Sequence, residues 1–366
     1  MYPWLIILLC FLAAVCPQSH SLKVGVFGAG RVAQAHGRNI VSNPRADIAW
    51  VVEPQQELGE KFSRDFHCPV FKSWQEAVTN SIRADCYLIA SATASHAPLI
   101  EALASLQQPI FCEKPIDVST ARIQEIIRAM QEKDVKLLHG FNRRFDPSLA
   151  RLKQRIASGE IGKIECLALY SYDHPLNKLD YLKTSGGIFH DFAVHDLDLA
   201  QWLLGEDNPV ISVFATGSTF KVPELSSLSP PLNVDSTTTI LKTKSGALAE
   251  ISNGLYSPYG YETRIEVQGS LGMLRCESAK PTSVELHNAE GVTRDKLVRD
   301  FMERYSESFK LELDHFFDVV ETDQKPIASA MDGLSANLIA DACAESLQTG
   351  RRVKVKELTS EFPVGS

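Results

Sequence analysis

The feature that most restricts the fold of this chain is a glycine-rich turn between an apolar strand and a helix. Residues 22–27, LKVGVF, form a short apolar run, and GAGRVA follows it before a stretch with helical spacing. In this G-x-G-x-x-A pattern Gly28 permits a tight turn, Gly30 lets an anion approach the backbone, and Ala33 allows close packing of helix on strand. The free N–H groups of the helix start then face the anion. The turn therefore predicts a βαβ unit and a parallel sheet.

An acidic residue closes the second strand of this unit. Glu53 lies at the end of the apolar run 46–54, 23 residues after Gly30. A carboxylate at this spacing accepts hydrogen bonds from the adenosine ribose of a dinucleotide, and it repels a 2′-phosphate. No arginine follows Glu53 directly. We therefore expect NAD as the cofactor, with NADP the less favoured alternative.

The alternation of strands and helices continues to residue 142 and then changes. Apolar strand candidates at 85–90, 109–115 and 136–141 are separated by helical segments, which predicts a Rossmann-type, doubly wound parallel sheet. Longer strand candidates joined by Ser-Gly turns follow, and they indicate an α+β domain with a mostly antiparallel sheet. The predicted divisions are a leader at 1–21, a cofactor domain at 22–142, a second domain at 143–355 and a tail at 356–366. A late helix is expected to pack back on the first domain.

The charge balance argues against a nucleic-acid partner. The chain has 45 acidic and 37 basic side chains, a formal net charge of −8, and no long basic block that could neutralise phosphates.

The leader and the body indicate different compartments. The apolar run 4–15 is too short to span a bilayer comfortably and precedes a small-x-small pattern, so it resembles a secretory signal. No Lys or Arg precedes Lys23, however, and the cysteines of the body are scattered, with Cys86 and Cys112 inside strand-like runs as in reduced intracellular proteins. The sequence leaves the compartment open and predicts no membrane span in the mature chain.

The segment SGGIFHDFAVHDLDLA, residues 185–200, places two histidines and three aspartates among apolar residues. At about 100° per residue, Asp191, His195 and Asp198 fall within about 60° of one another on one helix face. Asp196 lies about 100° from His195 and is left out of this set. The simplest alternative is a helix start with capping carboxylates and a structural histidine.

Six segments resemble the successive motifs of the Gfo/Idh/MocA oxidoreductases, most closely those of the inositol 2-dehydrogenase branch. They are VGVFGAGRVAQAH, SATASHAPLIEAL, EKPI, GFNRRFDP, SGGIFHDFAVHDLDLAQWL and RIEVQGSLGML, and the resemblance covers Leu22 to about Val355. It implies NAD(P)-dependent oxidation of a secondary hydroxyl on a small-molecule polyol. We expect myo-inositol as the substrate, with scyllo-inositol or another sugar as the alternative. The resemblance also implies a homo-oligomer, a dimer or tetramer, formed through an open C-terminal sheet.

The resemblance assigns the chemistry to Lys114 of the EKP motif and to the D-x-x-x-H pair Asp191 and His195. Oxidation of an alcohol requires a base that takes the hydroxyl proton, and an imidazole suits that task near neutral pH. Asp191 is expected to orient the ring of His195. Lys114 is expected to hold the reacting oxygen and stabilise developing alkoxide charge. The structural alternative for Lys114 is a surface ion pair with Glu113.

The remaining site residues follow from the same motifs. The expected cofactor-binding residues are Gly28, Gly30, Arg31, Val32, Glu53, Ser91, Thr93, His96, Glu113 and Lys114. The expected substrate-binding residues are Lys114, Asn142, Arg143, Asp191, His195 and Asp198. Specificity is expected from polar residues of the segment 171–187, namely Asp173, His174, Asn177, Asp180 and Tyr181. We expect no metal ligands and no direct chemical role for His190, and Pro115 is a candidate for a cis peptide bond.

Two other function classes stay open at this stage. The histidines and aspartates of FHDFAVHD are also the residue types of a metal-dependent phosphohydrolase. A noncatalytic NAD-dependent sensor would keep the dinucleotide fold without turnover. The presence of Lys114, Asp191 and His195 argues against the sensor. The hydrolase is disfavoured because its metal sites need ligands from several helices, whereas the first half of this chain has the pattern of a dinucleotide fold.

Overall fold

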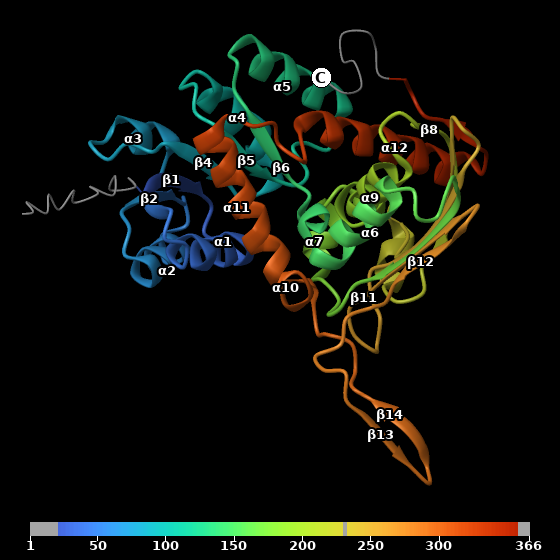
Figure 1. Cartoon of the computed structure of the whole chain (residues 1–366). Helices are drawn as coiled ribbons and strands as arrows, with labels where there is room; N and C mark the ends of the chain where they lie inside the picture. Colours follow the sequence, from blue (N-terminus) through green and yellow to red (C-terminus); the bar gives the residue numbers. More distant parts are fainter. Residues whose placement is uncertain (1–20, 230–232, 358–366) are drawn as a thin grey trace, which may run out of the picture.

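The computed structural model describes residues 21–229 and 233–357, which form two large sheets, with helices around and between them, and a small two-stranded sheet (Figure 1). All of the predicted leader except Ser21, and the end of the predicted tail from residue 358, lie outside the described residues. No helix within the described ranges is both long and apolar enough to cross a membrane.

The first sheet confirms the predicted doubly wound fold. Its six strands are all parallel, in the order β3-β2-β1-β4-β5-β6. The strands are β1 (Leu22–Phe27), β2 (Ala46–Val52), β3 (Val70–Phe71), β4 (Cys86–Ile89), β5 (Ile110–Glu113) and β6 (Leu137–Gly140). The helices that connect them are α1 (Arg31–Val41), α2 (Gln56–Phe66), α3 (Trp74–Thr79), α4 (His96–Ala104) and α5 (Thr120–Glu132), with the 3₁₀ turn η1 (Thr93–Ser95) before α4. This order reverses direction between β1 and β4, where such sheets bind ligands beyond the carboxyl ends of their strands.

The glycine turn forms as its sequence predicts. Gly28 adopts φ +97°, and a Cβ there would lie 2.6 Å from the backbone oxygen of Ala90 on the neighbouring strand. Only glycine fits this position. Gly30 is the N-cap of α1, and a Cβ placed on it would meet nothing within 4 Å. The space in front of the first turn of α1 is therefore open.

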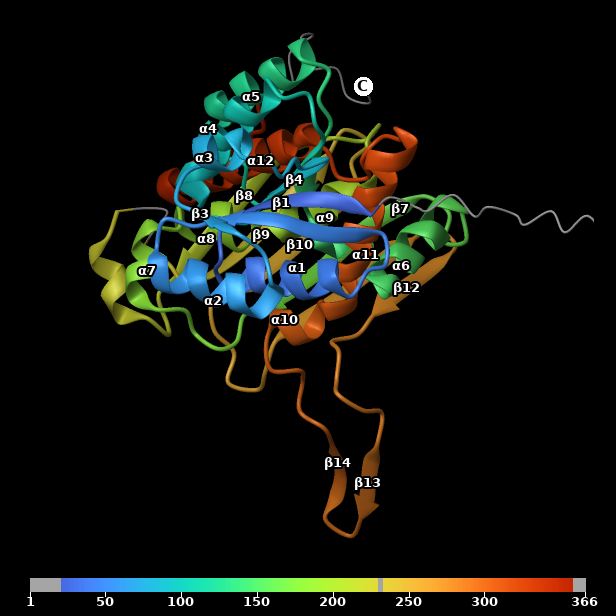
Figure 2. The ribbon, with the colours of Figure 1, turned by 90° about the vertical axis from the view of Figure 1, so that its left-hand side faces the viewer.

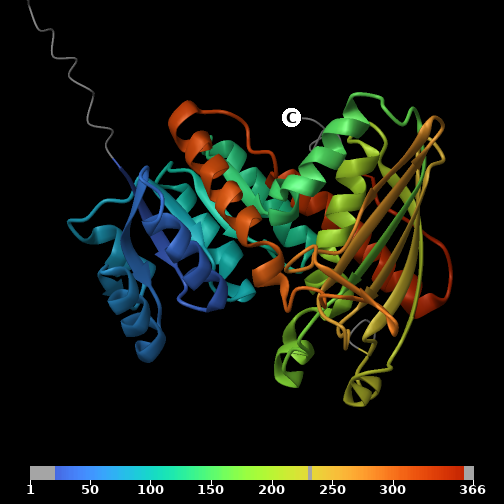
Figure 3. The same ribbon diagram turned by 60° about the horizontal axis from the view of Figure 1, so that its bottom comes forward.

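The second sheet has seven strands in the order β12-β11-β7-β10-β9-β8-β15. All neighbours are antiparallel except β7 and β10, which are parallel. The strands are β7 (Ile164–Tyr172), β8 (Val210–Ser218), β9 (Ser236–Thr243), β10 (Leu248–Gly254), β11 (Glu262–Gly269), β12 (Gly272–Cys276) and β15 (Val353–Lys354). Helices α6 (Pro147–Ala157), α9 (Val194–Leu204) and α12 (Ala330–Thr349) pack against one face. The opposite face of the sheet carries no described helix (Figure 3).

Two late helices join the domains. Helix α11 (Ser306–Thr322) packs against α1 and against the 3₁₀ turn η2 (Asn142–Phe145). Helix α12 contacts α5 and β6 of the first domain and β8 and α9 of the second, so it lies between the two sheets (Figures 1 and 3). Its start is fixed by a capping box in which the Ser329 and Asp332 side chains bind each other's backbone N–H.

The segment expected as one helix at 185–200 is broken in two. Helix α8 (Gly187–Asp191) ends at Asp191, and α9 starts three residues later at Val194. A projection at about 100° per residue therefore does not apply across residues 192 and 193. Asp191 and His195 are not one turn apart on a continuous helix.

Several small elements were not predicted from the sequence. These are the short helix α7 (Leu179–Thr184), the 3₁₀ turn η3 (Pro223–Ser227), the helix α10 (Phe301–Arg304) and a hairpin of β13 (Glu285–Asn288) and β14 (Gly291–Arg294). All eight strand residues of the hairpin are exposed, and it projects away from the body (Figure 2).

Candidate active site

A cavity of about 1080 Å³ lies between the two domains. It is lined by residues at the carboxyl ends of β1, β2, β4 and β5 and by residues of α8 and α9. Of the residues predicted for specificity, Asp173, Asn177 and Tyr181 line this cavity, whereas His174 and Asp180 do not. All residues predicted for catalysis, the cofactor or direct substrate binding line it except Asp198. These residues are Gly28, Gly30, Arg31, Val32, Glu53, Ser91, Thr93, His96, Glu113, Lys114, Asn142, Arg143, Asp191 and His195.

The dinucleotide end of the cavity is built by β1, α1 and β2. Glu53 is 9 % exposed; its Oε2 accepts the N–H of Ala29 at 3.0 Å, and its Oε1 accepts the N–H of Gln55 at 2.9 Å. These bonds hold the carboxylate at the strand end, in the position that a ribose hydroxyl requires. Together with the open N-terminus of α1, this arrangement fits the adenosine and pyrophosphate of NAD.

Arg31 extends from the first turn of α1 to the second domain. Its guanidinium lies 4.5 Å from the ring centroid of Phe301, and both side chains line the cavity. The cation–π contact therefore joins the anion-binding turn to α10.

His96 begins α4 and is almost completely buried. Its Nδ1 lies 2.8 Å from the backbone oxygen of Pro115, and its Nε2 lies 3.0 Å from that of Ser91. Burial lowers its pKa, against the opposing effect of these backbone contacts. The ring thus ties the loop after β4 to the turn after β5, whose Lys114–Pro115 bond is cis.

Lys114 and Asp191 meet across the domain boundary. Nζ of Lys114 donates to the backbone oxygen of Asp191 at 2.7 Å and to its Oδ1 at 3.1 Å. The hydroxyl of Tyr181 donates to the same Oδ1 at 2.7 Å. The lysine is therefore anchored by the second domain, not by a surface ion pair with Glu113, whose carboxylate instead accepts the backbone N–H of Lys114.

His195 lines the cavity from the first turn of α9. Its Nδ1 is buried and has no hydrogen-bond partner among the described residues, and the ring of Phe141 packs edge-on at 6.1 Å. Burial lowers the pKa of His195 well below its usual range, and the charges of Lys114 and Arg143 add to this effect. The ring is therefore a neutral proton acceptor. Asp191 does not orient it as expected, because the aspartate is engaged by Lys114 and Tyr181.

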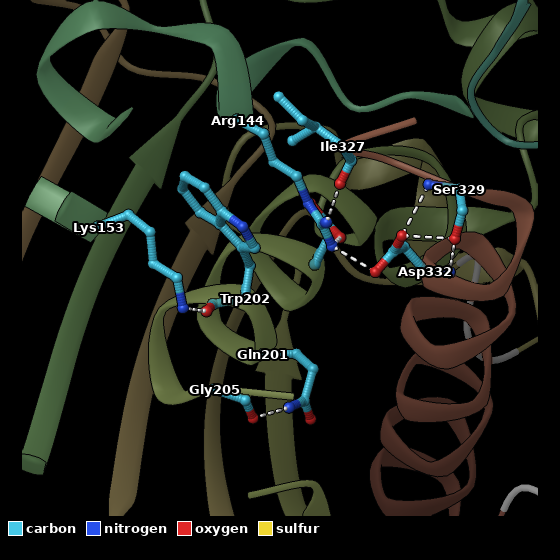
Figure 4. Close-up of polar contacts among 9 residues, drawn as sticks. Arg144, Lys153, Gln201, Trp202, Gly205, Ile327, Ser329 and Asp332 are labelled. Atoms are coloured by element: carbon cyan, nitrogen blue, oxygen red, sulfur yellow. Dashed lines mark hydrogen bonds and ion pairs between the residues drawn. The ribbon is translucent and has the colours of Figure 1, made fainter. Parts of the chain in front are cut away.

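The expected substrate contact of Asp198 is wrong in this geometry. Asp198 is 2 % exposed, and both of its oxygens accept from the guanidinium of Arg144, at 2.6 and 3.1 Å. Arg144 also donates to Asp332 and to the backbone oxygen of Ile327 (Figure 4). The carboxylate is therefore occupied by a buried ion pair with Arg144, which holds η2 against α9 and α12.

Arg143 lines the cavity, but its guanidinium is held by protein groups. It pairs with Asp196 and donates to the hydroxyls of Ser171, at 3.3 Å, and Tyr261, at 3.2 Å. Asn253 donates to the other oxygen of Asp196 at 2.7 Å. Asp196 therefore has a structural partner, which agrees with leaving it out of the acid–base set.

The metal-hydrolase alternative finds no support in this segment. Nε2 of His190 lies 2.9 Å from Oδ1 of Asp341, whereas Asp196 pairs with Arg143 and Asp198 with Arg144. The three side chains therefore bind different partners and do not form a common metal site.

Besides the expected specificity residue Asp173, the cavity has aromatic residues that the sequence motifs did not single out. Asp173 follows β7, and burial raises its pKa to about 6. Its oxygens accept from the N–H of His174 and from Asn177. Tyr261 directly precedes β11, Tyr305 lies between α10 and α11, and Phe309 is in the first turn of α11. No local pattern marks these aromatics, because they are brought to the cavity by strands and helices far along the chain.

Comparisons with known proteins agree with this geometry. Residues 22–141 match the family described as "Oxidoreductase family, NAD-binding Rossmann fold", and residues 153–355 match its "C-terminal alpha/beta domain". The chain is 35 % identical to inositol 2-dehydrogenase of Rhizobium meliloti, over 92 % of this chain and 99 % of the relative. It is 30 % identical to scyllo-inositol 2-dehydrogenase (NAD(+)) of Bacillus subtilis, over 92 % and 97 %.

A solved structure shows the same fold. The myo-inositol dehydrogenase of Corynebacterium glutamicum superposes with a TM-score of 0.86 at 34 % identity, covering 93 % of this chain and 100 % of that one. The family, the NAD-binding fold and the oxidoreductase class expected from the motifs are confirmed. The chain belongs to the Gfo/Idh/MocA family of oxidoreductases.

Proposed function

We propose that this protein is an NAD-dependent dehydrogenase that oxidises a secondary hydroxyl of a cyclitol, with myo-inositol as the preferred substrate. The observation that carries the proposal is the meeting of Lys114 with Asp191 beside His195, in a cavity whose other end is the glycine turn of β1 and α1. The inositol dehydrogenases among its relatives support the substrate class.

The side chains divide the reaction between them. NAD, when bound, supplies the acceptor for the hydride that leaves the carbinol carbon. His195 is neutral and takes the hydroxyl proton. The ammonium of Lys114 stabilises the alkoxide character that develops on the oxygen. Asp191 accepts from that ammonium and is itself held by the hydroxyl of Tyr181, so the reacting oxygen meets a positioned charge.

The polar residues after β7 suit a ring that carries several hydroxyls. Asp173 and Asn177 line the cavity and bind each other through a 3.2 Å hydrogen bond, and Tyr181 lines it as well. Neighbouring donors and acceptors of this kind can bind the hydroxyls on either side of the reacting one. We assign these three residues to substrate binding in place of Asp198.

A second candidate is a scyllo-inositol dehydrogenase, which the similarity to the Bacillus subtilis enzyme favours. The two substrates differ only in the orientation of one hydroxyl, so the same acid–base group can serve both. The preference for NAD over NADP rests on Glu53, whose charge repels a 2′-phosphate.

Turnover of the full-length chain tests this function. The purified protein is mixed with NAD or NADP and with myo-inositol, scyllo-inositol or an aldose, and the absorbance of reduced nicotinamide is followed. We expect the highest kcat/KM with NAD and myo-inositol. NAD binding without oxidation of any substrate would instead identify a sensor.

We also propose that the uncovered face of the second sheet binds another copy of the chain. Phe214 on β8 and Ile240 on β9 are directly paired on this face and are 41 % and 39 % exposed. Leu248 on β10 and Met273 on β12 are exposed at 44 % and 48 %. Light scattering should give a dimer or tetramer, and Phe214→Glu should shift it toward the monomer. The secretory leader and the compartment stay predictions.

A further inference from the structure

A second cluster of titratable groups lies next to the cavity. It consists of His36 on α1, Glu113 on β5 and Glu312 on α11, and one ligand-type atom from each lies within 4.8 Å of the others. Nε2 of His36 is 2.6 Å from Oε1 of Glu113. His36 and Glu312 are fully buried, and Glu113 alone lines the cavity.

The carboxyl group of Glu312 is unpartnered. Neither of its oxygens, nor Nδ1 of His36, has a hydrogen-bond partner among the described residues. The His36 ring is packed edge-on between Phe111 and Phe309. An ionised carboxylate in such an apolar site, close to a second carboxylate, is strongly unfavourable unless a positive charge compensates it. Burial, and secondly the charge of Glu113, raise the pKa of Glu312 well above its usual range.

A proton fits this site better than a metal ion. Two ligands bound about 2.0–2.2 Å from one metal lie roughly 3 Å or more apart, but the imidazole of His36 and the carboxylate of Glu113 are already closed into a 2.6 Å contact. Neither His36 nor Glu312 lines the cavity, so a metal there would have no cavity water to complete its coordination.

We propose that Glu312 is a positioning residue that carries a proton in the working enzyme, so that Glu113 is the single negative charge of the cluster. Glu113 accepts from His36 through one oxygen and from the backbone N–H of Lys114, at 3.3 Å, through the other. A charged Glu312 would repel Glu113 toward the cavity and disturb the start of the Lys114 turn. The positioning part of this inference rests on the proposed role of Lys114; the protonation part does not.

The pH dependence of stability tests the protonation without any substrate. The unfolded chain releases the proton of Glu312 near pH 4.3, whereas the native chain keeps it to higher pH. Above pH 4.3 the native state therefore binds more protons, and this residue lowers the stability of the wild type as pH rises, by up to tenfold in the unfolding equilibrium constant per pH unit. Glu312→Gln removes the penalty. Its stability relative to the wild type should grow from pH 5 upward until Glu312 ionises.

Glu307→Gln is the matched control, because Glu307 lies on the same helix and has the same side chain, but is exposed. Its stability relative to the wild type should change little over this range. A pH-independent difference for Glu312→Gln would show that Glu312 is ionised and overturn the proposal.

Three further measurements complete the test. The infrared spectrum of the wild type at neutral pH should contain a carboxylic-acid C=O band that Glu312→Gln lacks. Metal analysis of the purified full chain is the second measurement, and a stoichiometric divalent metal would overturn the proposal. Glu312→Ala, which gives Glu113 room to move, should lower kcat about tenfold with little change in KM for NAD, and Glu312→Gln should restore it. Unchanged kcat in Glu312→Ala would overturn the positioning role, whereas failure of the dehydrogenase assignment would leave the stability and infrared results intact.

Discussion

Nζ of Lys114, at the end of a strand in the first domain, lies 2.7 Å from the backbone oxygen of Asp191, at the end of a helix in the second. The ammonium is thus positioned by the protein before any substrate arrives. Positioned charge of this kind is usually the largest contribution to stabilising a developing oxyanion. The two domains must stay in contact for the site to be complete.

Lys114→Met should therefore abolish most of the turnover. The thioether keeps the length of the side chain but removes the charge, so we expect kcat to fall about 10²-fold or more, with the affinity for NADH, measured by fluorescence titration, nearly unchanged. Lys183→Met, at an exposed position of α7, is the control for loss of a lysine. A proportional loss of NADH affinity would mean that Lys114 acts in cofactor binding instead.

His195→Ala should separate chemistry from binding in the same way. Removing the base should reduce kcat by roughly 10²-fold, while NAD binding is retained. Because the pKa of His195 is lowered, the wild-type base stays deprotonated across neutral pH, and kcat/KM should show its acid limb below the usual imidazole pKa of about 6.5. An acid limb centred above pH 7 would contradict this environment.

Local patterns in the sequence were sufficient for the parallel sheet and the cofactor end of the site. The turn at Gly28 and Gly30 and the carboxylate at Glu53 are specified within one βαβ unit, so neighbouring residues determine them. The helical projection, in contrast, grouped Asp198 with His195 correctly by angle but could not show that Arg144, 54 residues earlier, binds that carboxylate. Which side chains pair across so many residues of sequence depends on tertiary packing.

The break between α8 and α9 was missed for a related reason. Asp191 and His195 have the spacing of one helical turn, and nothing in FHDFAVHD forces the helix to end. The end is set by what each half contacts, Lys114 and Tyr181 for Asp191 and the cavity wall for His195. The exposed hairpin at 285–294 buries no strand residue, so apolar periodicity could not reveal it.

Asp198→Ala should affect folding more than substrate affinity. It leaves the guanidinium of Arg144 buried without one of its two carboxylate partners, and breaking a buried pair costs about 3–5 kcal/mol. Urea unfolding should show this loss, whereas KM for the polyol should change less than twofold at a temperature where the variant is folded. The double variant Arg144→Leu, Asp198→Leu should regain part of the stability. A large rise in KM without loss of stability would restore Asp198 to the substrate site.

Glu53→Ala should weaken the discrimination between NAD and NADP. The change removes the charge that repels a 2′-phosphate, and Lys72, which follows the neighbouring strand β3, lines the same cavity and can attract it. We expect the ratio of kcat/KM for NAD to that for NADP to fall by roughly tenfold or more. Glu57→Ala, on the exposed side of α2, should leave the ratio unchanged.

His139→Leu should reduce the sensitivity of the fold to acid. His139 is 1 % exposed, neither ring nitrogen has a partner among the described residues, and burial lowers its pKa to about 3. The unfolded chain takes up this proton near pH 6.5 and the native chain only far below, so the unfolded state binds more protons between these values. Stability contributed by the neutral ring is present above pH 6.5 and is lost as pH falls, by up to about 1.4 kcal/mol per pH unit.

Chemical unfolding measured from pH 7 to pH 4.5 should therefore show a shallower decline in the free energy of unfolding for His139→Leu than for the wild type. His287→Leu, in the exposed hairpin, should decline in parallel with the wild type. A parallel decline for His139→Leu as well would show that His139 takes up its proton over the same pH range in the native and unfolded states, and would contradict this prediction.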